Sequence, residues 1–513
     1  MSIFYFGAIL VLVLELISYV HGHNSSSCYH PEKVPAQAQK NDTPMIVSAY
    51  YPGYNSKFLP VEKIPWKMYN HLQYFVAVPD SKPEEDLIIE TEENMIQVIK
   101  AAKQNKVSIS LSVGGWTGSR TFSFLVGDSK NRTSFVETIA RAVHKYGLDG
   151  IDLGKFTNLF FFLLQLPIII LLLLFQLIPI EEQKRMKSRQ RINFYFLLIL
   201  FCEEACGILI RAFIYPTTDW EYPNEQGLGC NALNANDTKN FLAFLKLLRK
   251  KLGTSHRLSA AVSMKGFMSP DGQNYLSDVS EFAKVLNFFT IMAYDVYGSS
   301  FSKLAGPNSP LYSTCSEPTK KYSVAQTIKQ WTSTGIPSRQ LLLGIPSYGY
   351  AYTLLSSKIT PSHLSGQPGV TSLLFQPHAD TVPESGKTAG QAGGTDACGN
   401  PNVAGGQWLF KELSETGKLS NDQQKGLNGY RRIYDNCTHT PFLFNPSTKN
   451  LISYDDSFSL KEKASYALEH GLGGVEMFDA TGDTLDSQLL RSVRRVLFPG
   501  EKNALHGIRA TST

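Results

Sequence analysis

Residues 149–153 read DGIDL and residues 219–223 read DWEYP, and the two stretches together make one β-strand pattern. Joined end to end, they place Asp152, Asp219 and Glu221 on one face of a strand, because side chains alternate between the two faces. Buried carboxylates are costly unless they have a task. Acids that alternate at the end of an apolar strand therefore indicate a catalytic site.

Short apolar runs alternate with amphipathic stretches along the chain, which is typical of a parallel sheet with helices between its strands. An open doubly wound sheet would show the same alternation, but eight strands with intervening helices favour a closed (β/α)8 TIM barrel. We predict this α/β fold over residues 43–498. The predicted strands are Met45–Tyr50, His71–Ala77, Val107–Val113, Gly150–Leu153, Leu258–Ser263, Phe289–Tyr294, Leu341–Pro346 and Gly473–Phe478.

The connection between the seventh and eighth strands is unusually long. Roughly a hundred residues separate the seventh strand from the helix expected at Ser459, and structureless loops of that length are uncommon. The stretch is rich in Gly, Ser, Asn and Tyr. We therefore predict a small inserted α+β domain at residues 354–457.

A second anomaly lies inside the fourth strand, at residues 154–218. Residues 156–180 carry no charge and are dense in Phe, Leu and Ile, and by length they match a membrane-spanning helix. Basic residues follow between positions 184 and 191, as the positive-inside rule requires. A single crossing would nevertheless place the first and second halves of the barrel on opposite sides of the membrane. A functional membrane span is therefore disfavoured.

Removing residues 154–218 rebuilds the fourth strand in frame. The genetic code permits this cut, because Gly154-Lys155 can be encoded with a splice donor and Thr218-Asp219 with an acceptor, so that splicing restores one Asp codon. We interpret the segment as a translated, unspliced intron. A genuine family-specific insertion is the alternative.

The joined strand carries acids at four positions, Asp149, Asp152, Asp219 and Glu221. This spacing resembles the catalytic signature DxxDxDxE of glycoside hydrolase family 18, the chitinases, in its fungal-like class V type. The resemblance extends over residues 43–498. It implies a (β/α)8 barrel with the acids at the carboxyl end of the fourth strand, where the active sites of such barrels form.

Three further motifs resemble those of the same family. SVGGW at residues 112–116 is similar to the third-strand motif, and MAYD at residues 292–295 is similar to the sixth-strand motif. GGV at residues 473–475 resembles the eighth-strand motif, but Phe478 stands where that motif usually ends in Trp. Tyr350 stands where many relatives carry a basic residue. The motif positions marked in this way are Ser112, Gly114 and Gly115, together with Asp149.

The resemblance implies substrate-assisted hydrolysis with retention of configuration. Glu221 would protonate the glycosidic oxygen while the acetamido carbonyl of the substrate attacks the anomeric carbon. Asp219 would hold the acetamido N–H and share a proton with Asp152, and Tyr294 would hydrogen-bond the acetamido oxygen. Crowding of three carboxylates raises at least one pKa, which keeps Glu221 protonated near neutral pH. The residues expected to shape the sugar subsites are Tyr50, Trp116, Met292, Asp295 and Phe478.

The N-terminus predicts secretion. Residues 3–19 are almost uniformly apolar and are followed by small residues at the usual cleavage spacing, so we predict a signal peptide at residues 1–22, with an uncleaved anchor as the alternative. Five sequons agree with a secretory route and an extracellular glycoprotein. They begin at Asn24, Asn41, Asn131, Asn236 and Asn436.

Seven cysteines fit an oxidising compartment without making a disulfide scaffold. Cys230 follows the fourth strand and Cys315 the sixth, both at the predicted barrel mouth, so we pair these two. Cys398 and Cys437 both fall in the predicted insertion, and we pair them as a staple of that domain. Cys28 is left over.

Composition and charge exclude several classes of protein. The formal net charge is only +5 in 513 residues, with no basic arm, so nucleic acid is not expected as a partner. No ligand spacing typical of a metal site appears, and the implied reaction needs no cofactor. We expect a monomer that binds chitin or chito-oligosaccharides.

Two rival functions share the resemblance. The same mechanism would serve an endo-β-N-acetylglucosaminidase acting on the core of N-glycans, but a groove walled by the inserted domain favours chitin. A catalytically impaired, chitin-binding lectin is the non-enzyme alternative. The presence of Glu221 argues against it, whereas the 69 positions between Asp152 and Glu221 argue for impaired activity of the literal chain.

We predict that the mature transcript lacks the codons for residues 154–218, and that the shorter protein is secreted, soluble and active while the full chain is not. A barrel strand must hydrogen-bond to both neighbours, and a 65-residue excursion leaves few residues on each side to hold its register. Transcript sequencing and assays of both proteins on a chito-oligosaccharide check this. Mature transcripts that retain the segment, with an equally active full chain, would identify a tolerated insertion instead.

Overall fold

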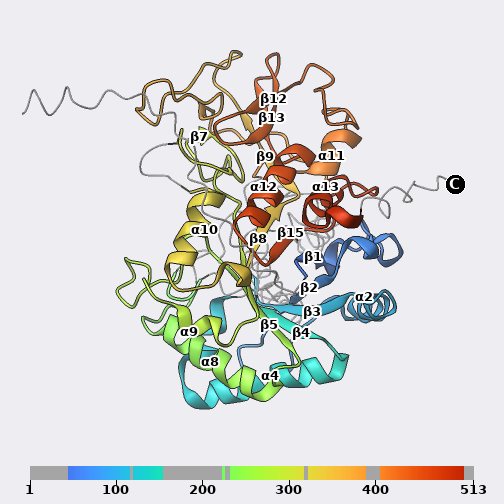
Figure 1. Ribbon diagram of the computed structural model, residues 1–513, viewed down its shortest axis with the longest axis vertical. Coiled ribbons are helices and arrows are strands. Elements are labelled where there is room, and N and C mark those ends of the chain that lie inside the picture. Colours follow the sequence, from blue (N-terminus) through green and yellow to red (C-terminus); the bar gives the residue numbers. More distant parts are fainter. Residues whose placement is uncertain are drawn as a thin grey trace, which may run out of the picture. The chain divides into compact units, whose positions relative to one another are not determined.

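Eight parallel strands form a closed barrel in the computed structural model, which describes residues 44–115, 119–153, 222–225, 231–316, 322–388 and 405–501 (Figure 1). Going round the barrel, the order is β1, β15, β8, β6, β5, β4, β3 and β2. Closure confirms the predicted (β/α)8 barrel over an open sheet, because β1 pairs with both β2 and β15. The strands are β1 (Ile46–Pro52), β2 (His71–Ala77), β3 (Ser108–Val113), β4 (Gly150–Leu153), β5 (Arg257–Val262), β6 (Phe288–Ile291), β8 (Leu341–Pro346) and β15 (Gly474–Phe478).

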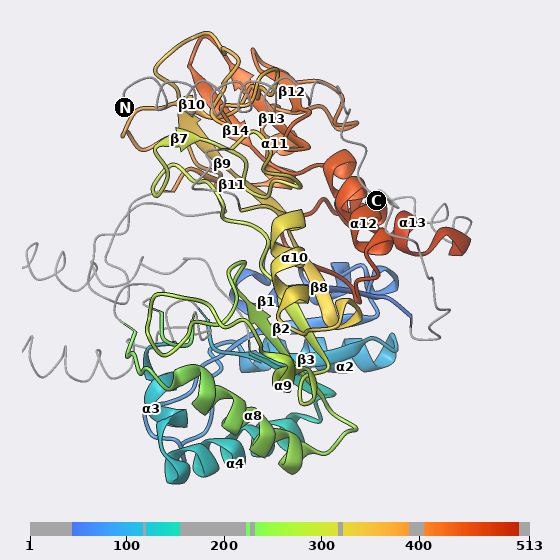
Figure 2. The ribbon, with the colours of Figure 1, turned by 60° about the vertical axis from the view of Figure 1, so that its left-hand side comes forward.

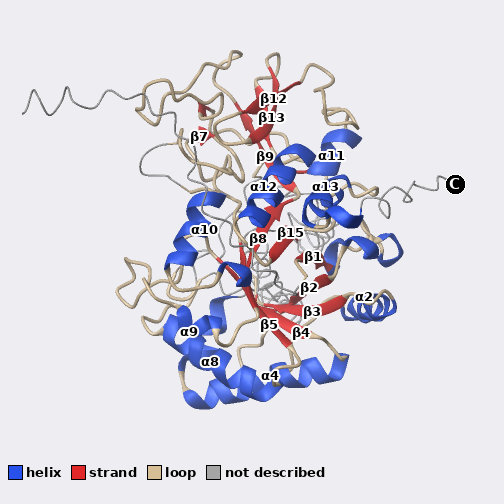
Figure 3. Cartoon of the chain, in the orientation of Figure 1, coloured by secondary structure: helices blue, strands red, loops and turns tan. Residues whose placement is uncertain are grey.

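Helices lie around the outside of these strands, as Figure 3 shows in blue against the red strands. Local sequence sets their ends. The Asp128 carboxylate caps α4 by accepting from the backbone N–H groups of Lys130 and Asn131. Gly147, whose φ of 61° favours glycine, follows the last helical residue as the C-terminal cap. The helices are α2 (Glu92–Gln104), α3 (Phe122–Gly127), α4 (Ser129–Tyr146), α8 (Asp237–Leu252), α9 (Ser280–Ala283), α10 (Val324–Ser333), α11 (Phe410–Glu415), α12 (Ser457–Glu469) and α13 (Gln488–Leu497). Among the described residues, no helix is both long enough and apolar enough to cross a membrane.

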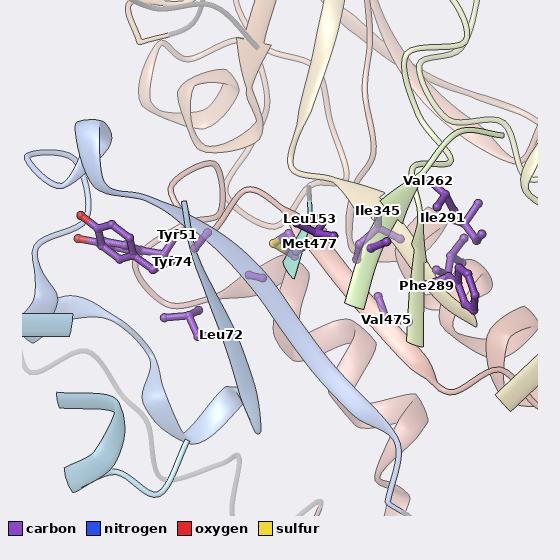
Figure 4. Packing of buried hydrophobic residues seen from close by; sticks show 14 of the residues in the cluster. Tyr51, Leu72, Tyr74, Leu153, Val262, Phe289, Ile291, Ile345, Val475 and Met477 are labelled. Carbon is purple, nitrogen blue, oxygen red and sulfur yellow. The ribbon is translucent and has the colours of Figure 1, made fainter. Parts of the chain in front are cut away.

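The main hydrophobic core lies between the strands and this outer layer of helices. Outward-facing strand residues such as Leu72, Leu153 and Val475 are 4% exposed or less and pack in one cluster (Figure 4). Because side chains alternate along a strand, the residues between them face the barrel interior. Those interior positions carry polar side chains, which are candidates for a buried active site.

A five-stranded antiparallel sheet is inserted between β8 and β15 (Figure 2). Its first strand begins at Tyr348, directly after Ser347, so the sheet starts six residues before the predicted lower bound at residue 354. Where the chain leaves the barrel, the Ser347 hydroxyl donates to the carbonyl oxygen of Asp479, the residue that follows β15. In order, the strands are β11 (Gln407–Leu409), β9 (Tyr348–Thr353), β14 (Asn450–Ser453), β13 (Thr440–Asn445) and β12 (Arg431–Asp435). A small ribbon pairs β7 (Leu304–Ala305) with β10 (Gln376–Pro377).

Cys315 and Cys437 form a disulfide, with 6.1 Å between their Cα atoms. The predicted pairings of Cys315 with Cys230 and of Cys437 with Cys398 are therefore wrong. The reason is that the turn between β12 and β13 packs on the loop after β6, where the backbone N–H of Leu311 donates to the carbonyl oxygen of Thr438. Cys230, Cys398 and the segment 154–218 lie outside the described residues.

The disulfide predicts a specific peptide pattern and a stability change. Non-reduced peptide mapping should find Cys315 linked to Cys437. Replacing both with Ala should lower the free energy of unfolding by about 2–4 kcal/mol, because the bridge closes a long loop in the unfolded chain. A peptide that links Cys437 to Cys398 would contradict this assignment.

Candidate active site

Asp152 is the one predicted catalytic acid among the described residues, and it is fully buried inside the barrel. It faces inward from β4, between its register partners Ser112 of β3 and Ser259 of β5. The Tyr50 hydroxyl donates to its Oδ2 at 2.9 Å, and the Ser259 hydroxyl donates to its Oδ1 at 2.6 Å. Burial raises the pKa of Asp152, whereas these hydrogen bonds lower it. The carboxyl group is held in one orientation by neutral donors.

A second carboxyl group, Glu476 of β15, lies in the same interior. The Gln73 amide donates to its Oε2 at 3.2 Å, and the Thr290 hydroxyl donates to the same oxygen. Burial is the largest cause and the nearby Asp152 the second, and together they raise the pKa of Glu476 to about 7. The barrel interior therefore holds two buried carboxyl groups, those of Asp152 and Glu476.

Aromatic rings cluster around Tyr50, whose hydroxyl contacts Asp152. The Tyr50 ring lies 5.6 Å from the Phe478 ring and 5.8 Å from the Phe75 ring, measured between centroids. The Tyr294 ring lies 6.0 Å from Phe478, and Met292 belongs to the same buried cluster. We call the rings of Tyr50, Phe75, Tyr294 and Phe478 the aromatic wall; all four are 3% exposed or less. Aromatic rings are the side chains that pack on sugars where a face is accessible.

Asp295 connects this wall to the inserted sheet. Two hydroxyl groups from β9, those of Tyr348 and Tyr350, donate to its Oδ1 at 2.6 and 2.7 Å. Asp295 has a φ of 57°, and its backbone N–H donates to the Asn308 side chain. Tyr350, at the position where the family often carries a basic residue, therefore holds Asp295 by a hydrogen bond from a neutral donor.

The glycines of the third-strand motif and Asp149 shape or bind the backbone in this structure. Gly114 and Gly115 have φ values of 127° and 122°, which only glycine adopts readily, and Gly114 N–H donates to the carbonyl oxygen of Ala77. The Asp149 carboxylate accepts from the backbone N–H of Ile109, so it ties the start of β4 to β3. The hydroxyl of Ser112 lies beside Asp152 and lowers its pKa.

The structure thus brings together six of the predicted site residues. Three others lie outside the described residues. Sequence reasoning missed four interior polar residues, and the signal that marks them is the alternation of polar and apolar residues along each strand. The residues that the structure brings together are Asp152, Tyr50, Tyr294, Met292, Asp295 and Phe478. Those outside the described residues are Asp219, Glu221 and Trp116. The interior polar residues that sequence reasoning missed are Gln73, Ser259, Thr290 and Glu476.

No group of three or more His, Cys, Asp and Glu side chains in the described parts of the chain is arranged to hold a metal ion. What the arrangement offers is acid–base chemistry. A buried carboxyl group with a raised pKa, oriented by hydroxyl donors beside aromatic faces, is suited to proton sharing next to a bound sugar.

Gly344 of β8 makes room for Tyr294, which provides a test of this wall. A Cβ at Gly344 would lie 2.4 Å from the carbonyl oxygen of Ile291 and 3.1 Å from the Tyr294 ring. Gly344→Ala should therefore lower the free energy of unfolding by about 1–3 kcal/mol through overpacking, and should weaken ligand binding by displacing the ring. Gly127→Ala is the matched control, since nothing lies within 4 Å of its added Cβ. Equal stability and binding of the two variants would show that Tyr294 tolerates the shift.

Known proteins resemble this chain over most of its length. It is 31% identical over 444 residues to a chitinase-like effector of Moniliophthora roreri. The aligned region covers 86% of this chain and 90% of that protein. It is 22% identical to Chitinase 1 of Aphanocladium album, over 77% of this chain and 67% of that protein. A chitinase structure from Rhizomucor miehei superposes with a TM-score of 0.67 at 28% identity, covering 88% of this chain and 99% of the other.

The model of the family "Glycosyl hydrolases family 18" matches residues 46–154 and 218–483. The interruption between the two matched parts falls within the segment 154–218, whose origin as an intron stays a prediction. The matched residues include the whole barrel from β1 to β15 and every predicted catalytic position. The chain belongs to glycosyl hydrolase family 18.

Proposed function

We propose that this protein is a secreted chitinase that hydrolyses β-1,4-linked N-acetylglucosamine polymers with retention of configuration. The observation that carries the proposal is the setting of Asp152, which two hydroxyl donors orient at the inward face of β4 beside the aromatic wall. Membership of the family and the chitinases among its relatives support the substrate class. Secretion rests on the predicted signal peptide at residues 1–22.

In the proposed reaction, Glu221 gives its proton to the glycosidic oxygen as the bond to the anomeric carbon breaks. The acetamido carbonyl oxygen of the same sugar forms the new bond to that carbon, giving an oxazolinium ion. Asp219 accepts the acetamido N–H and offsets the positive charge. Water then attacks the anomeric carbon and returns a proton to Glu221, which restores the enzyme.

Asp152 and Tyr294 assist these steps from positions that the structure describes. Asp152 holds the proton that Asp219 gives up, and burial favours this because it raises the pKa of Asp152. The ring of Tyr294 lies in the aromatic wall, from which its hydroxyl would hydrogen-bond the acetamido oxygen. Strand alternation would put Asp219 and Glu221 on the face of Asp152 once residues 154–218 are removed.

A second candidate function is chitin binding without hydrolysis. It is favoured by the name of a relative at 31% identity, "chitinase-like effector". It is also favoured by the separation of Asp152 and Glu221 in the full chain. Both functions use the same aromatic wall, so they differ only in whether the proton donor is in place.

In the form without residues 154–218, Glu221→Gln should lower the rate of hydrolysis by several orders of magnitude, because proton donation acts only in the transition state. Chito-oligosaccharides should still bind. Glu225→Gln is the matched control. Glu225 lies four residues further along the chain, and its Oε2 is 3.7 Å from Lys265 Nζ, so turnover should stay within about twofold of the unsubstituted form. Hydrolysis of a chito-oligosaccharide and binding by calorimetry are the measurements.

Each result assigns one of the two functions. Near-normal turnover of Glu221→Gln would mean that another residue is the acid. If the unsubstituted form binds chito-oligosaccharides but releases no product, the protein is a chitin-binding module and the chitinase proposal is wrong.

A further inference from the structure

Two consecutive buried residues, Asn308 and Ser309, bind the backbone on either side of Tyr294. The Ser309 hydroxyl donates to the carbonyl oxygen of Ala293 at 2.6 Å, and the side-chain oxygen of Asn308 accepts from the backbone N–H of Asp295 at 2.8 Å. Asn308 is 1% exposed and Ser309 is fully buried. The two peptide groups that flank Tyr294 are therefore both held by side chains, and we call Asn308 and Ser309 the Tyr294 clamp.

The clamp acts where the backbone turns away from β6. Asp295 has a φ of 57°, a left-handed conformation that residues other than glycine seldom adopt. The main chain of Asn308 adds a further bond, because its carbonyl oxygen accepts from the backbone N–H of Val296 at 3.0 Å. This turn is therefore bound to the clamp by both backbone and side-chain groups.

The inserted sheet fixes Asn308 in turn. The Asn308 amide nitrogen donates to the carbonyl oxygen of Tyr348 on β9 at 2.9 Å, and its backbone N–H donates to the hydroxyl oxygen of Ser453 on β14 at 3.2 Å. The Tyr348 ring also lies 6.1 Å from the Tyr294 ring, measured between centroids. Both ends of the Asn308 amide group are used, so the side chain is held in one orientation relative to the barrel.

Tyr294 is the residue that hydrogen-bonds the acetamido oxygen of the substrate in the proposed reaction. That oxygen is the nucleophile, so the position of the Tyr294 hydroxyl matters most in the transition state. A reacting group reaches this accuracy only when the residues behind it hold it in place. We propose that Asn308 and Ser309 are positioning residues, which hold the backbone of Tyr294 so that its hydroxyl meets the acetamido oxygen. The inference rests on the proposed function for its effect on rate.

Asn308→Ala and Ser309→Ala each remove one side of the clamp. In the form without residues 154–218, each should lower kcat for a chito-oligosaccharide by about tenfold or more with little change in KM, because a misplaced group costs most in the transition state. Steady-state kinetics measure both constants. An unchanged kcat in both variants would overturn the proposal.

Asn70→Ala is the matched control, because Asn70 makes the same two kinds of bond elsewhere. Its side chain accepts from the backbone N–H of Val47 at 2.9 Å and donates to the carbonyl oxygen of Met45 at 2.8 Å. It lies just before β2, at the end of the barrel opposite to Tyr294. Asn70→Ala and Asn308→Ala should both lower the melting temperature, but only Asn308→Ala should lower kcat. Equal losses of kcat would mean that Asn308 has a structural role alone.

A double-mutant cycle with Tyr294→Phe separates positioning from general damage. Once the hydroxyl is gone its position no longer matters, so Ser309→Ala should lower kcat/KM much less in Tyr294→Phe than in the unsubstituted form. Losses that simply multiply would overturn the proposal. Ser309→Ala is the smaller change, so the cycle remains available if Asn308→Ala does not fold. Full activity of Tyr294→Phe would contradict the role of Tyr294, and this inference with it, while leaving Glu221 as the proposed acid.

Ligand binding replaces turnover if neither form of the protein hydrolyses chito-oligosaccharides. The chitinase proposal is then wrong, but the clamp still predicts that Ser309→Ala weakens binding in the unsubstituted protein and not in Tyr294→Phe. Calorimetry measures the two Kd ratios, and equal weakening in both backgrounds would overturn the proposal. Hydrogen exchange of the peptide around Asp295 needs no ligand. It should speed up in Asn308→Ala, which removes the acceptor of the Asp295 N–H, and unchanged exchange would show that the clamp does not hold this turn.

Discussion

The alternation of side chains along the strands of a closed barrel is the constraint on which the rest of this structure depends. One face of every strand must pack against helices and is apolar, as at Leu72 and Val475. The other face points into an interior that water cannot freely enter, and there the chain places Asp152 and Glu476 among hydroxyl and amide donors. Burial perturbs these acids, and the closed strand order keeps them together.

The strands themselves could be predicted from the sequence because apolar runs with turn signals between them mark buried parallel strands. β2, β4 and β8 have the predicted bounds. β6 was predicted to reach Tyr294 but ends at Ile291, since the chain turns away toward Asp295, whose φ is positive. The start of the inserted sheet was missed because β9 follows β8 after a single residue, and a run of tyrosines gave no sign of a new sheet.

The site was predictable where a motif marked it and not where only three-dimensional packing did. Asp152, Tyr294 and Phe478 belong to the family motifs, and the structure brings them together with Tyr50, which was expected to shape a sugar subsite. Glu476 went unnoticed because a single acid in an apolar strand resembles a satisfied structural residue until its neighbours are known. The disulfide pairing failed for a related reason, since the spacing of cysteines does not tell which loops meet.

The bond between Cys315 and Cys437 has a consequence for limited proteolysis. The two bridged cysteines are 122 residues apart in the sequence, and the chain between them includes α10, β8 and β9. A single protease cut anywhere between the two cysteines therefore leaves both pieces covalently joined. After a cut between β9 and Cys437, β8 and β9 also stay hydrogen-bonded to β15 and β14 of the other piece. A nicked molecule would run as an intact chain on a gel until reductant separates its fragments.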